Sequence, residues 1–184
     1  MSKIAIVYHS GYGHTEVLAK AISEGAKESG AEVTLMKCDK VDFNLLNASD
    51  AIIFGCPTYM GTVSAEMKMF MDSCNSVWKT QRWRNKIAAG FTNSTAYSGD
   101  KLNTLMQFVL FSMQMGMVWS GLDIMAGNVS SKGTEKEMNR IGSWVGMMGQ
   151  SNSDETADTA PPESDRKTAR YFGKRIADLC KEMK

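Results

Sequence analysis

Ile4-Ala-Ile-Val-Tyr-His-Ser-Gly-Tyr-Gly-His-Thr-Glu-Val-Leu-Ala19 is the stretch that decides the fold of this chain. It begins with a short apolar run, residues 4–8, which predicts a buried strand. Ser10-Gly-Tyr-Gly13 interrupts this run, and apolar residues then recur at the spacing of a helix. A strand, a tight loop and a helix therefore follow one another within this one stretch.

The start of that helix is a predicted anion site. The first N–H groups of a helix lack backbone partners, and the helix dipole places partial positive charge beside them, so phosphate binds there. Ser10 and Thr15 add hydroxyl donors, while Gly11 and Gly13 let the backbone approach a ligand closely. Taken alone, the two glycines are equally typical of an ordinary strand–helix turn.

Composition limits the classes of function. The 184 residues are most simply one domain, residues 1–184, and 21 basic against 20 acidic residues indicate no nucleic-acid partner. Four cysteines without paired spacing or a histidine cluster predict no metal site and fit a reducing cytoplasm. We expect no signal peptide and no membrane partner, because no apolar run approaches about 18 residues.

Apolar runs and helical periodicity alternate along the whole chain. This alternation predicts an α/β fold, a flavodoxin-like three-layer sandwich with a five-stranded parallel sheet of order 2-1-3-4-5 and helices on both faces. Residues 121–162, rich in Gly, Ser and Asn, are expected to form an insert before the last helix. The expected strands are residues 3–8, 32–37, 50–55, 86–92 and 117–119, and the expected helices begin near residues 14, 64, 102 and 163.

Polar loops follow the first, third and fourth expected strands, at residues 10–15, 56–61 and 93–99. Ligands of open parallel sheets bind beyond the carboxyl ends of the strands, so we expect these loops to converge. The first loop lacks both G-x-x-x-x-G-K-[ST] and G-x-G-x-x-G, which disfavours nucleoside triphosphates and dinucleotides. Neutral donors for one phosphate, with aromatic and polar groups for a flat ring, fit FMN.

Several of these motifs resemble known flavoproteins. Ser10-x-x-Gly13-His-Thr-Glu16 resembles the FMN phosphate loop of flavodoxin-like proteins. Gly55-Cys-Pro-Thr-Tyr-Met-Gly61 with Ser64-Ala-Glu-Met-Lys-Met-Phe-Met-Asp72 resembles the G-x-P-T-x-x-G…M-x-x-F-x-D segment of WrbA-type NAD(P)H:quinone oxidoreductases and related NADPH-dependent FMN reductases. The third loop and Gly116-Met117 also resemble this family, as does the terminal pattern of Pro161, Asp165, Ala169 and Gly173.

This resemblance implies which residues hold the cofactor. The expected phosphate contacts are Ser10, Tyr12, Gly13, His14 and Thr15, and the expected contacts on and around the ring are Pro57, Thr58, Tyr59, Met60, Gly61, Thr92, Asn93, Ser94, Thr95, Tyr97, Ser98 and Gly99. Trp78 stands where the family has a substrate-side tryptophan, and Gln114 stands where close members have a histidine. No catalytic side chain is expected, because the redox chemistry belongs to the flavin.

Three functions are open. The first is an FMN-dependent oxidoreductase that transfers hydride from NAD(P)H through bound FMN to quinones, flavins or similar small acceptors, for which the family implies a homodimer or homotetramer. The alternative is a flavodoxin-type one-electron carrier, a class that is typically acidic because charge steers its docking. The third is a binding module without flavin. The net charge of +1 favours the enzyme over the carrier, and the three loops disfavour the module.

Overall fold

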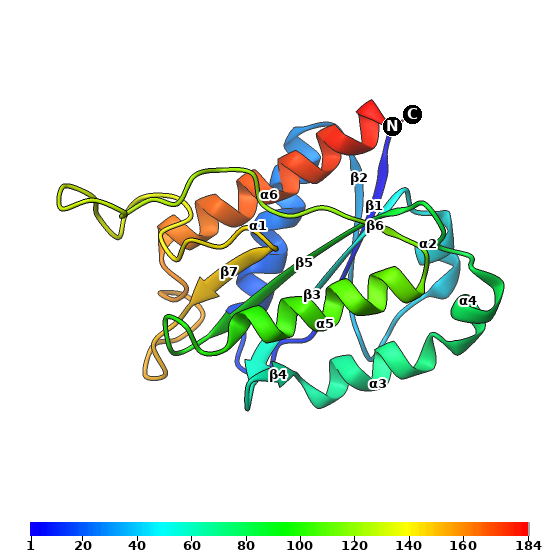
Figure 1. The fold of residues 1–184 in the computed structure, drawn as a ribbon, viewed down its shortest axis with the longest axis horizontal. Coiled ribbons are helices and arrows are strands. Elements are labelled where there is room, and N and C mark those ends of the chain that lie inside the picture. Colours follow the sequence, from blue (N-terminus) through cyan, green and yellow to red (C-terminus); the bar gives the residue numbers. More distant parts are fainter. Residues whose placement is uncertain (184) are drawn as a thin grey trace.

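A computed structural model of the chain describes residues 1–183 and has strands and helices in alternation (Figure 1). In chain order the elements are β1 (Lys3–Tyr8), α1 (His14–Glu28), β2 (Glu32–Lys37), α2 (Phe43–Ala48), β3 (Ala51–Tyr59), β4 (Thr62–Val63), α3 (Ala65–Ser73), α4 (Asn75–Thr80), β5 (Ile87–Ser94), α5 (Lys101–Gln114), β6 (Val118–Trp119), β7 (Met147–Gln150) and α6 (Glu163–Glu182). None of these helices combines the length and apolar character that a membrane span requires.

The order of the main strands confirms the prediction. Neighbouring strands follow the path β2-β1-β3-β5-β6, and every pair along it is parallel. With β5 and β6 as the fourth and fifth main strands, this is the predicted 2-1-3-4-5 order. The chain leaves β1 on one side towards β2 and returns to β3 on the other, which makes the carboxyl ends of β1 and β3 the expected ligand site.

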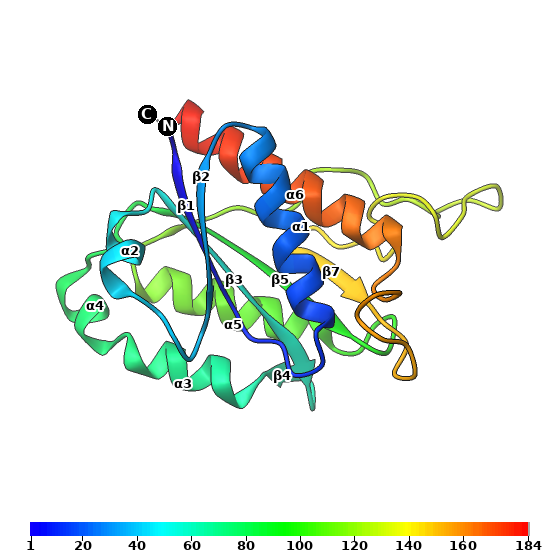
Figure 2. The ribbon, with the colours of Figure 1, turned by 180° about the vertical axis from the view of Figure 1, so that it is seen from behind.

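The predicted count of five strands is wrong, because the sheet contains two more. The short strand β4 pairs antiparallel with the end of β3, and β7 pairs parallel with residues Phe91 to Ser94 of β5. Since β6 pairs only with Ile87 and Ala88, β6 and β7 share the fifth position. Residues 120–146 connect β6 to β7, and this segment leaves the sheet and projects beyond it (Figures 1 and 2). The sequence gives little sign of β7, because a four-residue segment with an internal glycine becomes a strand only by pairing with β5.

Helices cover both faces of the sheet, as predicted. Helices α1 and α6 lie on one face and α2 to α5 on the other (Figure 2). The central strand β3 serves both cores: Ile53 packs with the first set, and Ile52 and Phe54 pack with the second. The Phe54 ring lies 5.4–6.3 Å, between centroids, from four further rings, those of Phe70, Trp83, Phe108 and Phe111.

Helices α1 and α6 pack closely against each other. A Cβ atom at Gly173 would lie 1.9 Å from the backbone oxygen of Ile22, so only glycine permits this approach. The contact fixes the start of α1 relative to the segment that precedes α6. The start of α1 and the segment before α6 both contribute residues to the site described next.

Candidate functional site

A cavity of about 610 Å³ lies at the carboxyl ends of β1, β3 and β5, as the three polar loops predicted. Its volume is in the range typical of sites for small molecules and cofactors. The cavity is lined by Ser10, Gly11, Tyr12, His14, Thr15, Pro57, Thr58, Tyr59, Asn93, Ser94, Thr95, Ser153, Glu155, Thr156 and Ala157. Residues from all three predicted loops are therefore brought together, and a fourth segment joins them.

The loop after β1 presents unpaired donors at the start of α1. Gly13 caps the helix in a left-handed conformation, with φ of 91° and no side-chain cap. Helical hydrogen bonding starts where the N–H of Val17 donates to the oxygen of Gly13 (3.1 Å). The backbone N–H groups of His14 and Thr15 have no acceptor among residues 1–183. This is the donor arrangement that binds phosphate at helix N-termini.

Two hydroxyl groups complete this loop. Ser10 Oγ accepts from the N–H of Glu16 (3.2 Å), which leaves its own proton free to donate. The Thr15 side chain is almost fully buried and lines the cavity. Neither lysine nor arginine is among the cavity-lining residues of the described chain, so the donors here are neutral. The site is suited to a single phosphate held by N–H and hydroxyl groups at a helix start.

The two glycines of this loop lie close to neighbouring segments, and the positive φ of Gly13 is one that other residues rarely adopt. A Cβ atom at Gly13 would lie 2.9 Å from Cβ of Ala157, and one at Gly11 would lie 2.6 Å from Oη of Tyr59. The interpretation of these glycines as an ordinary turn is therefore incomplete. They let the first loop pass between the second loop and the segment before α6.

The loop after β3 is held by a chain of buried hydroxyls. Thr58 Oγ1 lies 2.8 Å from both Thr92 Oγ1 and Thr104 Oγ1, and Thr92 Oγ1 donates to the oxygen of Cys56 (2.7 Å). This chain fixes Thr58 at the cavity wall from β5 and α5. Thr92, expected as a cofactor contact, does not line the cavity, because its side chain is enclosed behind the wall.

Six other predicted contacts also lie outside the cavity lining. Met60 is fully exposed and, with Gly61, makes the turn between β3 and β4, where both have positive φ. The hydroxyl of Tyr97 donates to Glu135 (2.7 Å), so this ring is directed to the insert. Ser98 and Gly99 do not line the cavity either. Gly13 caps α1 beside the cavity rather than lining it.

The substrate-side residues line a different cavity. Trp78 and Gln114 border a space of about 460 Å³ between α3, α4 and α5, together with Lys68, Asp72 and Leu110. It shares no lining residue with the first cavity. The single chain thus does not bring Trp78 or Gln114 to the cavity of the three loops, and their role beside a bound ring stays a prediction.

Sequence reasoning missed the fourth segment, residues 153–157. The ring of His14 anchors it, because Nε2 donates to the backbone oxygen of Glu155 (2.9 Å). This segment follows β7, so it reaches the carboxyl edge for the same reason as the other loops. A strand prediction at Met147–Gln150 would have found it, but this stretch is part of the expected insert.

His9 has two polar partners at the end of β1. Its Nδ1 lies 2.9 Å from Ser64 Oγ and 3.5 Å from Glu66 Oε2. Its ring also meets Tyr59 edge-on, with the ring centroids 6.4 Å apart. These contacts link the end of β1 to the start of α3 and give His9 a structural role.

Tyr59 and Cys56, both at the end of β3 beside the cavity, are held in their neutral forms. Burial, with smaller contributions from Tyr12 and Glu66, raises the pKa of Tyr59 above its ordinary value. Burial raises the pKa of the Cys56 thiol to about 12. Tyr59 is therefore a neutral hydrogen-bonding group at neutral pH, and Cys56 is not a thiolate nucleophile. The wall can bind and orient a ligand, whereas the chemistry must reside in the ligand.

The chain is similar to a known protein family, to curated proteins and to solved structures. A family model described as flavodoxin matches residues 6–113. The chain is 35% identical to flavodoxin FldP of Pseudomonas aeruginosa over 184 residues, covering 100% of this chain and 99% of that protein. It is 30% identical to an NAD(P)H dehydrogenase (quinone) of Methylocella silvestris, covering 100% of both chains. A solved structure of a flavodoxin, WrbA-like protein from Agrobacterium tumefaciens is 34% identical over the full length of both, with a TM-score of 0.74.

Proposed function

The chain belongs to the flavodoxin family, and on that basis we propose that it is an FMN-dependent oxidoreductase. In this proposal the donor is NAD(P)H and the acceptor is a quinone, a flavin or a similar small molecule. Relatives at about 30% identity that are named NAD(P)H dehydrogenase (quinone) support an oxidoreductase. The residues of the cavity support the choice of cofactor.

One observation carries the proposal: His14 and Thr15, whose N–H groups have no acceptor among residues 1–183, line the same cavity as the second and third loops. A phosphate at the start of α1 and a ring between the other loops are the two parts of FMN. The donor set also fits, because it consists of N–H and hydroxyl groups without a triphosphate-binding lysine. The residues present therefore fit FMN.

The side chains have positioning roles in this proposal. Ser10 and Thr15 donate to the phosphate, and Thr58, fixed by Thr92 and Thr104, presents its loop to the ring. Asn93 and Ser94 border the same cavity from β5. FMN, when bound, supplies the capacity to accept hydride and pass electrons on. The protein binds and orients it, and the neutral side chains at the cavity edge take no covalent part.

A one-electron carrier is the second candidate, because the 35% identical relative is named a flavodoxin. The balance of 21 basic and 20 acidic residues argues against it, since carriers of this kind use net charge to steer docking. Trp78 and Gln114 line the second cavity, between α3, α4 and α5, and they have a role in the proposed enzyme only where a substrate ring binds in that cavity.

Steady-state turnover distinguishes the two functions. FMN-loaded protein should reduce benzoquinone with NADH or NADPH as donor, and omission of FMN should abolish the rate. A carrier would show no turnover with either nucleotide, and a half-reduced flavin would accumulate during stepwise reduction. Absence of turnover together with that accumulation would overturn the enzyme proposal and favour the carrier.

A further inference from the structure

A buried lysine lies directly behind the cavity wall. Lys101, the first residue of α5, has a relative exposure of 0%. Its Nζ donates to Ser94 Oγ (3.0 Å) and to the backbone oxygen of Ala96 (2.7 Å). Ser94 lines the cavity, and its hydroxyl in turn donates to the backbone oxygen of Ala96 (2.9 Å), so the ammonium group is separated from the cavity by one residue. Its own acceptors are neutral.

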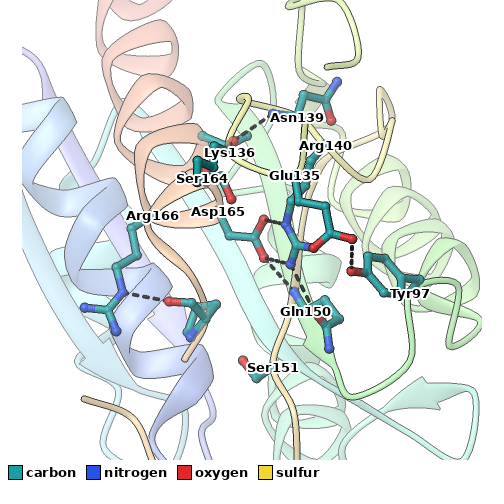
Figure 3. Close-up of polar contacts among 12 residues, drawn as sticks. Tyr97, Glu135, Lys136, Asn139, Arg140, Gln150, Ser151, Ser164, Asp165 and Arg166 are labelled. Carbon is teal, nitrogen blue, oxygen red and sulfur yellow. Dashed lines mark hydrogen bonds and ion pairs between the residues drawn. The ribbon is translucent and has the colours of Figure 1, made fainter. Parts of the chain in front are cut away.

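A second buried cation supports the neighbouring part of the wall. Arg140, whose side chain is 2% exposed, donates from Nε to Asp165 Oδ1 (2.8 Å) and from Nη2 to Asp165 Oδ2 (3.0 Å). Nη2 also donates to Gln150 Oε1 (3.1 Å) (Figure 3). Gln150 Nε2 in turn donates to the backbone oxygen of Thr95 (2.9 Å). Arg140 thus reaches the cavity-lining Thr95 through one residue.

The charges in this cluster do not cancel. Asp165 is the buried carboxylate of the cluster and makes its ion pair with Arg140. Glu135 lies 4.0 Å from Arg140 Nη1, but its side chain is 66% exposed and it accepts from the Tyr97 hydroxyl. Water screens an exposed carboxylate, whereas a buried charge acts through a medium of low dielectric constant. One positive charge, that of Lys101, is left over behind the wall.

The surroundings of Lys101 make its charged form costly, mainly because the side chain is buried. The pKa of Lys101 is lowered to about 8, chiefly by burial; Asp165 opposes this shift, and Arg140 adds a smaller lowering. The lysine is therefore still mainly protonated at neutral pH. A buried, uncompensated ammonium destabilises the empty protein and is stabilised by any anion that enters beside it.

We propose that Lys101 is a specificity-determining residue whose charge favours the negatively charged, reduced form of the ring bound in the cavity. The inference rests on the proposed FMN site. Two-electron reduction of neutral oxidised flavin with uptake of one proton leaves the ring with one additional negative charge. The electrons come from NAD(P)H in turnover or from dithionite in a titration. Lys101 should therefore tighten binding of reduced FMN more than binding of oxidised FMN.

The test compares Lys101→Met with Lys86→Met. Lys86 is a good control, because it is also partly buried and donates to backbone oxygens, those of Asn47 (2.9 Å) and Ser49, and burial also lowers its pKa. Lys86 directly precedes β5, so it lies at the opposite edge of the sheet, where the parallel strands begin. Both variants remove one charge from the full chain, but only one removes it behind the cavity.

Two measurements are made on each FMN-loaded protein at neutral pH: the dissociation constant of oxidised FMN and the midpoint potential in an anaerobic dithionite titration. Together they give the ratio of the dissociation constants of reduced and oxidised FMN. We expect Lys101→Met to raise this ratio about tenfold, a fall of about 30 mV for a two-electron couple. Lys86→Met should leave it within twofold of wild type. A merely structural lysine would change both constants alike and leave the ratio unchanged.

The wild-type protein supplies a second measurement if Lys101→Met does not fold. Reduction should then be accompanied by uptake of an additional proton at pH values just above the pKa of Lys101, because the reduced ring holds that proton on the lysine. The midpoint potential should fall more steeply with pH there than that of free FMN. An unchanged ratio and a slope like that of free FMN would each overturn the inference. Failure to bind FMN at all would instead overturn the proposed function.

Discussion

Asp165 offers a direct test of how the cavity wall is supported. The Asp165→Ala substitution removes an acceptor for Arg140 Nε (2.8 Å), Arg140 Nη2 (3.0 Å) and the N–H of Gln150 (2.8 Å). The side chains of Arg140 and Asp165 are both 2% exposed, so the guanidinium left behind could not be resolvated without opening the structure. Removing one partner of such a pair costs about 3–5 kcal/mol. Domains are stable by about 5–15 kcal/mol, so much of the total would be lost.

Urea unfolding followed by circular dichroism measures this loss, with Asp72→Ala as the matched control. Asp72 also pairs with a cation, Lys68, but its side chain is 67% exposed, and exposed pairs contribute under about 1 kcal/mol. The double variant Arg140→Met with Asp165→Leu should recover part of the loss, because neither member of the ion pair is left buried without its partner. A loss for Asp165→Ala no larger than that for Asp72→Ala would refute the reasoning.

Three further predictions follow from the same contacts. Phe54→Ala should lower the free energy of unfolding by about 3–5 kcal/mol, because four rings surround it, whereas Met69→Ala, at a residue 71% exposed, should change it little; equal effects in urea unfolding would contradict the assigned core. Thr15→Val should weaken FMN binding about tenfold or more in a fluorescence titration, because it removes a hydroxyl that binds a charged group; unchanged affinity would refute the phosphate loop. The pKa of Lys101 is lowered to about 8, so the unfolded chain binds more protons than the folded chain between pH 8 and the ordinary value of 10.5. The free energy of unfolding of wild type relative to Lys101→Met should therefore rise across that window, and a fall would contradict a buried, charged lysine.

The strand order was predictable because each main strand is a local apolar run. Residues 51–54 are buried on both faces by helices, and such strands are continuous in apolar residues. The strands β4 and β7 could not be predicted in this way. Both are short, and both exist because a neighbour, β3 or β5, offers an unpaired edge.

The site was predictable to the extent that it depends on the carboxyl-edge rule. Residues from the three predicted loops meet in one cavity, because parallel strands carry them to one edge. Residues 153–157 were missed, since the chain returns to that edge only after the excursion of residues 120–146 and the strand β7. Lys101 was missed because a lysine at a helix start is ordinarily solvated, and only the fold of residues 94–100 buries it. The predicted homodimer or homotetramer stays a prediction, which light scattering of dilute protein would test.

Anaerobic mixing of FMN-loaded protein with NADH and, separately, with NADPH tests the central claim most directly. One FMN should copurify with or rebind to each chain, and at least one nucleotide should bleach the flavin absorbance rapidly and completely. A protein that remains colourless in the presence of added FMN, or whose bound FMN is bleached by dithionite but by neither nucleotide, would contradict the claim that this chain is an FMN-dependent NAD(P)H oxidoreductase.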